Sequence, residues 1–215
     1  MPSRIIPFVN GHFYHVYNRG SERRSTFENQ RDYQRFLKTL KYYQIEGPKP
    51  RFSKFPSLTI TKLDNSKRLV EIIAYCLMPN HFHLLLKQVR DNGITESLSK
   101  VSNSYTKYFN TKHSRVGHLF QGEFKAVIIE SDEQLVHVSR YIHLNPISSA
   151  LVKNLEQYKW SSYPEYLNTG TQGFCSKKDI LGYFKDYRDY QQFVLDQESY
   201  AQEIELIKHQ LIEEV

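Results

Sequence analysis

Two apolar runs joined by a three-residue turn constrain the fold of this chain more than any other feature. The runs extend from Leu69 to Leu77 and from His81 to Gln88. Their length and composition predict two neighbouring strands of one sheet. Because side chains alternate between the faces of a strand, His81 and His83 point the same way, whereas Phe82 points into the core.

Two imidazoles side by side on a sheet face make half of a divalent-metal site, and a metal held there can polarise a phosphate or a carbonyl. A His-x-His pair arises readily by chance in a chain with nine histidines, so its place inside an apolar strand carries more weight than the pair itself. The chain has only two cysteines, so the metal needs histidine and oxygen ligands. This favours Mg²⁺ or Mn²⁺.

Composition limits the class of protein. With 215 residues, 40% of them hydrophobic, the chain can form one domain with a real core plus an appendage. No apolar run approaches the ~18 residues that cross a bilayer, and the apolar stretch near Met1 is short for a secretory signal. We therefore expect no membrane partner and a cytoplasmic location. The net charge of +6 suits a polyanionic partner.

Periodicity and turn residues predict the remaining elements of the first domain. They are a strand at Phe13–Tyr17, a helix at Asp32–Gln44, an irregular excursion over 51–68, a helix at about Thr95–Thr111 and a broken strand region at Val116–Ile129. Strand, helix, strand, strand, helix, strand is the order of a ferredoxin-like or RRM-like α+β fold. Helices then cover one face of an antiparallel sheet, and the other face is available to a ligand.

A third helix carries a second set of chemically useful side chains. A capping box at Ser131 predicts its start, and Pro146 predicts its end at the preceding residue. His137, Tyr141 and Asn145 recur every four residues along it and share one stripe.

A phenol is a poor nucleophile at its ordinary pKa of ~10, but it can attack a phosphate whose charge a metal neutralises. Asn145 offers an oxygen that could complete a two-histidine metal site. The alternative is a half-buried surface tyrosine followed by a C-terminal helix cap at Asn145.

From Ser176 onward the pattern is helical, and the last stretch, Glu203 to Glu214, is acidic. We interpret residues 176–215 as a helical C-terminal appendage too small to fold by itself.

Four motifs occur in an order that resembles one known family, the single-tyrosine HUH transposases, and specifically its REP-associated tyrosine transposase branch. They lie within residues 11–165, which we take as the catalytic domain. The motifs are Tyr14-His15-Val16-Tyr17-Asn18-Arg19-Gly20, Leu77-Met78-Pro79-Asn80-His81-Phe82-His83-Leu84-Leu85-Leu86, Gly117-His118-Leu119-Phe120-Gln121-Gly122 and Arg140-Tyr141-Ile142-His143-Leu144-Asn145-Pro146.

The resemblance implies an HUH nuclease fold and a metal-dependent transposase that cleaves and rejoins single-stranded, hairpin-containing DNA. It implies that His81 and His83 bind Mg²⁺ or Mn²⁺, that Tyr141 is the nucleophile and that Asn145 is the polar residue one turn later. In the insertion-sequence branch, the residue at this last position looks like a Gln. Asn145 has a shorter side chain than Gln. Attack by Tyr141 would leave a 5′-phosphotyrosine and a free 3′-OH, and another 3′-OH would reverse the step.

Basic residues are candidates for holding the DNA backbone. These candidates are Arg19, Arg23, Arg24, Lys112, Arg115 and Lys125. Rival nucleophiles also exist. The spacing of Tyr105 and Tyr108 assigns both to the core, whereas Tyr14 and Tyr17 precede the histidines, an order closer to that of relaxases.

Three other functions are compatible with the sequence. The same fold could be a catalytically silent module that binds single-stranded nucleic acid, a replication-initiator or relaxase-type HUH nickase, or a metallohydrolase that uses water. The resemblance to the insertion-sequence branch implies a dimer in which helices are exchanged between the active sites. The resemblance to the REP-associated branch implies a monomer. Monomer and homodimer therefore both remain open, and a DNA substrate implies association with the nucleoid.

Overall fold

The structure is a computed structural model that describes residues 7–47, 52, 67–168 and 173–196. Of the predicted segments, most of the excursion over 51–68 and the acidic tail lie outside the described residues. The elements are β1 (Phe13–Arg19), η1 (Ser21–Arg23), α1 (Gln30–Tyr43), β2 (Val70–Met78), β3 (His81–Gln88), α2 (Gly93–Lys112), β4 (Lys125–Ile129), α3 (Asp132–Ser148), η4 (Leu155–Gln157), α4 (Tyr163–Tyr166), α5 (Lys178–Leu181) and α6 (Tyr187–Leu195).

The sheet has four strands in the order β2-β3-β1-β4, and each neighbouring pair is antiparallel. Together with the order of the helices, this is the predicted ferredoxin-like arrangement. β1 lies between β3 and β4, so the strand that opens the domain contacts the histidine strand directly. Tyr17 lies opposite His83, and Arg19 lies opposite His81.

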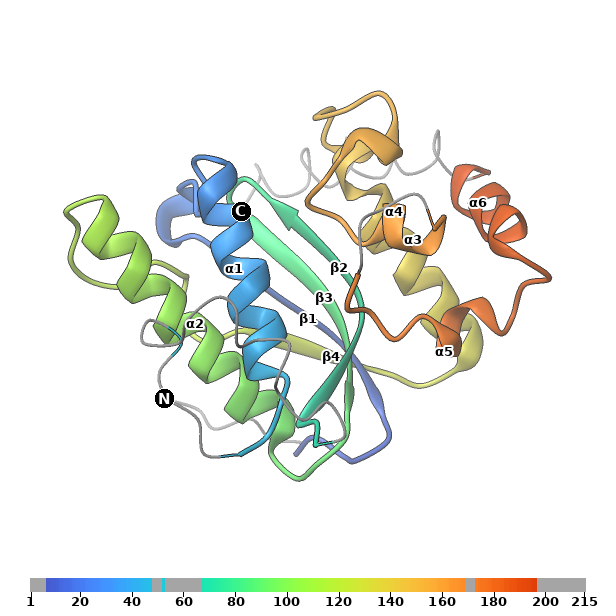
Figure 1. Cartoon of the computed structure of the whole chain (residues 1–215), viewed down its shortest axis with the longest axis horizontal. Helices are drawn as coiled ribbons and strands as arrows, with labels where there is room; N and C mark the ends of the chain where they lie inside the picture. The colour runs from blue at the N-terminus through green and yellow to red at the C-terminus, as the bar shows by residue number, and fades with distance from the viewer. Residues whose placement is uncertain (1–6, 48–51, 53–66, 169–172, 197–215) are drawn as a thin grey trace, which may run out of the picture.

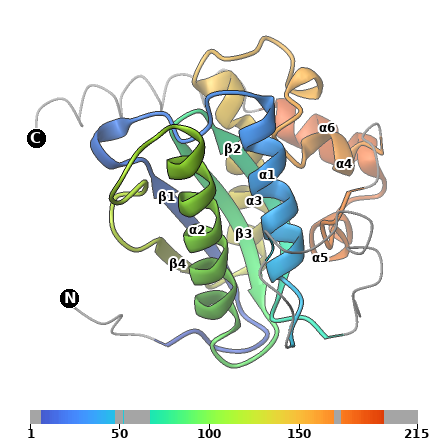
Figure 2. The ribbon, with the colours of Figure 1, turned by 60° about the vertical axis from the view of Figure 1, so that its left-hand side comes forward.

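Helices α1 and α2 lie on one side of the sheet, and α3 lies on the other with α4, α5 and α6 (Figures 1 and 2). Phe36 of α1 joins the first layer together, because its ring contacts Phe82 of β3 and Tyr105 of α2 at centroid distances of 5.2 and 5.1 Å. Phe82 therefore points into the core, as predicted.

From the sequence we expected helices on one face of the sheet and a second face available to a ligand. In the structure, this second face is only partly open. Helix α3 packs against β2 and β3, where Ile142 shares a buried cluster with Ile73 and Leu85. The ligand face is thus reduced to its β1 and β4 side, where Val127 is 48% exposed.

The predicted end of the third helix is wrong, because α3 continues through Pro146 to Ser148. Proline removes only the bond to one carbonyl in the last turn. The amide of Ser149 still donates to the Asn145 carbonyl at 3.0 Å. Leu144 and Ile147 are almost fully buried, and their burial outweighs the preference of the residue before proline for extended backbone. The predicted start is confirmed, since Ser131 accepts a bond from the Gln134 amide.

The fourth strand is shorter than predicted and begins only at Lys125. The preceding residues form a loop that is fastened to the end of β1. The Ser21 amide donates to the Leu119 carbonyl at 2.9 Å, and the Gln121 amide donates to the Arg19 carbonyl at 2.7 Å. Gly122 turns the chain with a φ of 71°, a conformation that favours glycine.

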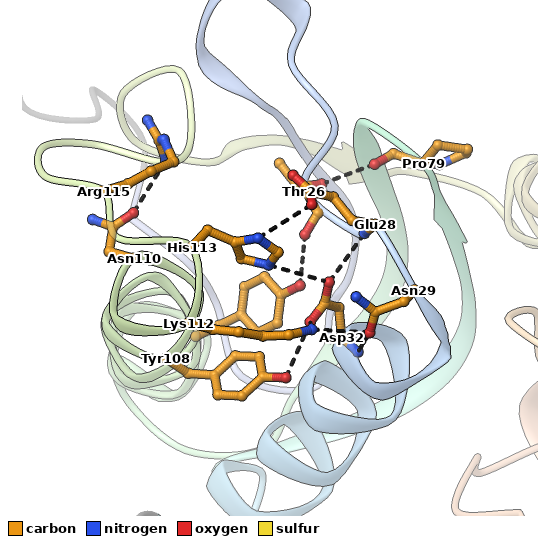
Figure 3. A network of polar contacts seen from close by, with 11 residues as sticks. Thr26, Glu28, Asn29, Asp32, Pro79, Tyr108, Asn110, Lys112, His113 and Arg115 are labelled. Atoms are coloured by element: carbon orange, nitrogen blue, oxygen red, sulfur yellow. Dashed lines mark hydrogen bonds and ion pairs between the residues drawn. The ribbon is translucent and has the colours of Figure 1, made fainter.

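A buried carboxylate joins the start of α1 to the end of α2 (Figure 3). The Asp32 side chain has no exposed surface, and the Lys112 ammonium lies 2.6 Å from its Oδ1. The Tyr108 hydroxyl donates to the same oxygen at 3.0 Å, and the Glu28 amide donates to Oδ2 at 3.1 Å. Three groups from different parts of the sequence thus converge on this one carboxylate.

The segment that precedes α1 also supports the turn between β2 and β3. The amides of Thr26 and Phe27 both donate to the Pro79 carbonyl, at 2.8 and 3.0 Å, and the Gly20 amide donates to the Asn80 carbonyl at 2.7 Å. Tyr105 of α2 donates its hydroxyl to the Thr26 carbonyl at 2.6 Å. The Asp32 network therefore lies directly behind the turn that leads into the His-x-His strand.

The described part of the C-terminal appendage packs against α3 and belongs to the same core. A buried chain of hydrogen bonds connects them. Ser139 donates its hydroxyl to the Val136 carbonyl at 2.7 Å, so it accepts from the Tyr190 hydroxyl at 3.2 Å. The Tyr190 oxygen then accepts from Nδ1 of His143 at 2.7 Å.

The chain continues from His143 to the sheet. The Ser162 hydroxyl donates to its Nε2 at 2.8 Å, and the Ser162 oxygen accepts from the Tyr75 amide of β2 at 2.9 Å. Burial lowers the pKa of His143 to about 3, which keeps the imidazole neutral and able to accept at Nε2. α3, α6 and the edge of the sheet are thereby held by one side chain.

We expect Tyr190→Phe to lower the free energy of unfolding by about 1–3 kcal/mol, because a buried donor on His143 loses its acceptor. Urea unfolding measures the change. Tyr187→Phe is the matched control on the same helix, where the hydroxyl is exposed and the expected change is under about 0.5 kcal/mol. Equal costs for the two variants would mean that the hydrogen-bond chain contributes nothing.

Among the described residues, no helix combines the length and the apolar character that a membrane span requires.

Candidate active site

The open part of the second sheet face carries a row of aromatic and imidazole side chains. His15 and Tyr17 alternate with buried residues on β1, and His83 points the same way from β3. Nε2 of His15 lies 2.9 Å from Nδ1 of His83, and the two ring planes differ by 24° with centroids 5.1 Å apart. The Tyr17 ring lies 5.9 Å from the His83 ring.

Helix α3 places Tyr141 over this row. The Tyr141 ring meets the His83 ring edge-on at 5.5 Å and the His15 ring at 5.9 Å. Its side chain is 36% exposed, so a large ligand can reach it. Sequence positions separated by more than 50 residues are thus brought together within one chain, as the predicted site requires.

His81 lies at the rim of the same face, next to His83, with ring centroids 5.1 Å apart. Its Nδ1 is 2.6 Å from the Asn80 side-chain oxygen. An amide oxygen only accepts, so Nδ1 of His81 carries the proton and the lone pair of the ring lies on Nε2. Burial, and then the nearby Arg19 charge, lowers the pKa of His81 to about 4, so the ring is neutral at pH 7.

An imidazole binds a divalent metal through a ring nitrogen that carries no proton, so His81 and His83 are of a type that fits such an ion. Among the described residues, no group of three His, Cys, Asp or Glu side chains is placed to hold a metal. His81 and His83 would therefore be joined by oxygen from Asn145, from water or from a substrate phosphate.

Asn145 lies one turn beyond Tyr141 on α3 and is almost fully buried. Its side-chain nitrogen donates to the Tyr141 carbonyl at 2.8 Å. Because the nitrogen is used in this bond, the amide oxygen is the atom that could serve a metal. Its role as a ligand stays a prediction.

Two of the six predicted DNA-binding residues lie beside the histidines. Arg19 is the strand partner of His81, and Lys125 is the strand partner of Tyr17 on the exposed edge strand β4. Both cations flank the row of rings, where they can attract a phosphate backbone.

Three of the other four candidates have protein partners. Arg24 pairs with Glu22 at 3.2 Å. Lys112 pairs with the buried Asp32, and Arg115 donates to Asn110 at 3.1 Å. Arg23 sits in the turn after β1, with a φ of 57°. Their DNA contacts remain predictions, and Lys112 has a structural role in addition.

The four tyrosines that could replace Tyr141 as the nucleophile lie in different parts of the structure. Tyr105 is buried between α1 and α2, as predicted, and Tyr108 serves the Asp32 network. Tyr14 is buried on the other face, where its hydroxyl accepts from the Val9 amide. Tyr17 lies in the site and therefore stays a rival to Tyr141 by position.

Sequence reasoning assigned no role in the site to His15 or Asn80. The alternation of His15 and Tyr17 along their strand places both on one face. That strand had to be known as the neighbour of β3 before His15 could be placed beside His83.

Part of this chain matches a known family of proteins. Residues 57–145, which include His81, His83 and Tyr141, match the family model described as IS200-like transposase. A Haemophilus influenzae protein named "Putative REP-associated tyrosine transposase" is 25% identical over 105 residues. That match covers 43% of this chain and 58% of the relative's length.

Among solved structures, a REP-associated tyrosine transposase bound to a REP hairpin has a TM-score of 0.53 to this chain at 16% identity. The alignment covers 81% of this chain and 89% of that one, so the likeness extends through the fold. Residues 57–145 of this chain thus resemble IS200-like transposases, and its fold is similar to that of a REP-associated tyrosine transposase.

Proposed function

We propose that this protein is a tyrosine transposase that cleaves and rejoins single-stranded DNA carrying a hairpin, with Tyr141 as the nucleophile. One observation carries the proposal: Tyr141 of α3 faces His83 across the open sheet, with rings 5.5 Å apart. A nucleophile beside a potential cation site on an accessible, basic-flanked face suits phosphoryl transfer. The hairpin substrate is inferred from the solved relative, which binds a REP hairpin.

In the proposed reaction, the Tyr141 oxygen forms a bond to the scissile phosphorus while the bond from phosphorus to the 3′ oxygen breaks. Tyr141 loses its proton, the 3′ oxygen gains one, and a 5′-phosphotyrosine remains on the protein. Attack by another 3′-OH reverses these changes. Arg19 and Lys125 hold the strand by its phosphates.

His81 and His83 would hold Mg²⁺ or Mn²⁺, with Asn145 as a candidate third ligand. When bound, the cation would orient the phosphate and stabilise the charge that develops on its oxygens.

Because Tyr141 faces histidines of its own chain, we propose that one copy contains a complete site. Size-exclusion chromatography combined with a cleavage assay on the monomer fraction tests this. A strict requirement for a dimer in cleavage would contradict it.

The direct test incubates the protein with 3′-end-labelled single-stranded hairpin DNA and Mn²⁺, followed by denaturing gel electrophoresis. A labelled band that survives denaturation, requires metal and disappears on protease treatment is expected. Cleavage without such a band would indicate hydrolysis by water, and binding without cleavage would indicate a passive module. Either result would overturn the proposal.

A further inference from the structure

His15 is the third imidazole on the site face, and neither ligation nor nucleophilic attack requires it. It lies on β1, where the rings of Tyr17 and Tyr141 flank it at 5.2 and 5.9 Å. Its Nε2 lies 2.9 Å from Nδ1 of His83, well within hydrogen-bonding range. The ring centroids of His15 and His83 are 5.1 Å apart and the ring planes differ by 24°, so the two rings are nearly coplanar, as a hydrogen bond between ring nitrogens requires.

A bond between two imidazole nitrogens contains one proton, which belongs to one ring or the other. If His15 donates, Nδ1 of His83 is the acceptor and the proton of neutral His83 lies on Nε2, so neither nitrogen can bind a cation. If His83 donates, its lone pair lies on Nε2 and can bind one. The position of this single proton decides whether His83 can be a ligand.

The neighbouring His81 has the second arrangement. Nδ1 of His81 donates to the Asn80 oxygen at 2.6 Å, which places the His81 lone pair on Nε2. Metal-binding histidines commonly donate their second N–H to such an acceptor, which orients the ring and sets its tautomer. Nε2 of His15 occupies the corresponding position at His83.

We propose that His15 is a positioning residue whose Nε2 accepts a hydrogen bond from the Nδ1–H of His83 and thereby directs Nε2 of His83 to the cation. His15 is then itself protonated on Nδ1. The inference deepens the proposed function, because it assigns a role to a residue outside the predicted ligand set. It concerns the protonation of one ring in the metal-free protein, and can therefore be measured without any DNA.

The first measurement is the tautomer of His83 in the metal-free full-length protein, by ¹⁵N NMR of the histidine rings at neutral pH. We expect a proton on Nδ1 in the wild type and in His15→Gln, whose side-chain oxygen reaches about the position of the lost Nε2. In His15→Phe the acceptor is missing, and we expect the His83 proton to shift toward Nε2.

The second measurement is the dissociation constant of Mn²⁺ by electron paramagnetic resonance. His15→Phe should bind Mn²⁺ about 10–100 times more weakly than the wild type, as expected for loss of such a partner. His15→Gln should bind within about threefold of the wild type, because the acceptor is restored. His12→Gln, on the exposed start of the same region, is the histidine control and should bind as the wild type does.

A proton on Nε2 of His83 in the wild type would overturn the inference at once. Equal weakening by His15→Gln and His15→Phe would also overturn it, since His15 would then act as something other than an acceptor. If His15→Phe does not fold, His15→Asn takes its place, because its shorter amide ends before the Nε2 position. Failure of the proposed function gives a different result, namely the expected tautomer and Mn²⁺ affinity without any covalent DNA adduct.

Discussion

Tyr141→Phe is expected to abolish the covalent protein–DNA adduct and to lower cleavage at least about 10³-fold, as removal of a covalent nucleophile does in other enzymes. The change deletes one oxygen and keeps the ring that contacts His15 and His83. The side chain is already 36% exposed, so folding should be preserved. The adduct is quantified on a denaturing gel, and hairpin affinity by fluorescence anisotropy should change less than about twofold, since the phosphate contacts remain.

Tyr17→Phe is the matched control, because Tyr17 lies on the same face with its ring 5.9 Å from that of His83. We expect this variant to retain the adduct. An adduct that survives in Tyr141→Phe and is lost in Tyr17→Phe would assign the nucleophile to β1, as the relaxase-like alternative requires.

Asp32→Ala is expected to lower the free energy of unfolding by about 3 kcal/mol, because it leaves Lys112 and two further donors without their buried acceptor. Urea unfolding measures this loss. Gln34→Ala, an exposed position on the same helix, controls for helix propensity and should change stability by under about 0.5 kcal/mol. A small cost at Asp32 would show that the network of Figure 3 contributes little.

The same carboxylate predicts a dependence of stability on pH. Burial raises the pKa of Asp32, but hydrogen bonds from Lys112, the Glu28 amide and Tyr108 outweigh it, so the pKa in the folded protein is lowered from 3.8. The ionised form is therefore favoured by folding, and its stabilisation is present above the unfolded-state pKa and lost as the pH falls.

Between about pH 5 and pH 3, the wild type should lose more stability than Asp32→Ala, because only the wild type must protonate this group. Unfolding curves of both proteins across this range test the difference. Parallel losses would mean that other carboxylates account for the whole acid sensitivity.

A stability loss in this network should also loosen the Pro79 turn that precedes His81, since the amides of Thr26 and Phe27 donate to the Pro79 carbonyl.

Local patterns were sufficient for much of the fold. An apolar run located β3 with its observed bounds, and the capping box located the start of α3, because both signals depend on neighbours within a few residues. The end of α3 was misjudged for the same reason. The local preference before Pro146 was overruled by burial of Leu144 and Ile147 against partners distant in sequence.

The sequence by itself determined which residue types form the candidate site: two histidines on one strand face, a tyrosine on a helix and basic residues around them. Only the tertiary structure decided that Tyr141 faces His83 of its own chain, that His15 contacts His83, and that Asp32 and His143 anchor the helices around them. These contacts join segments separated by tens of residues. Their geometry depends on strand order and helix packing, which periodicity within a single segment does not encode.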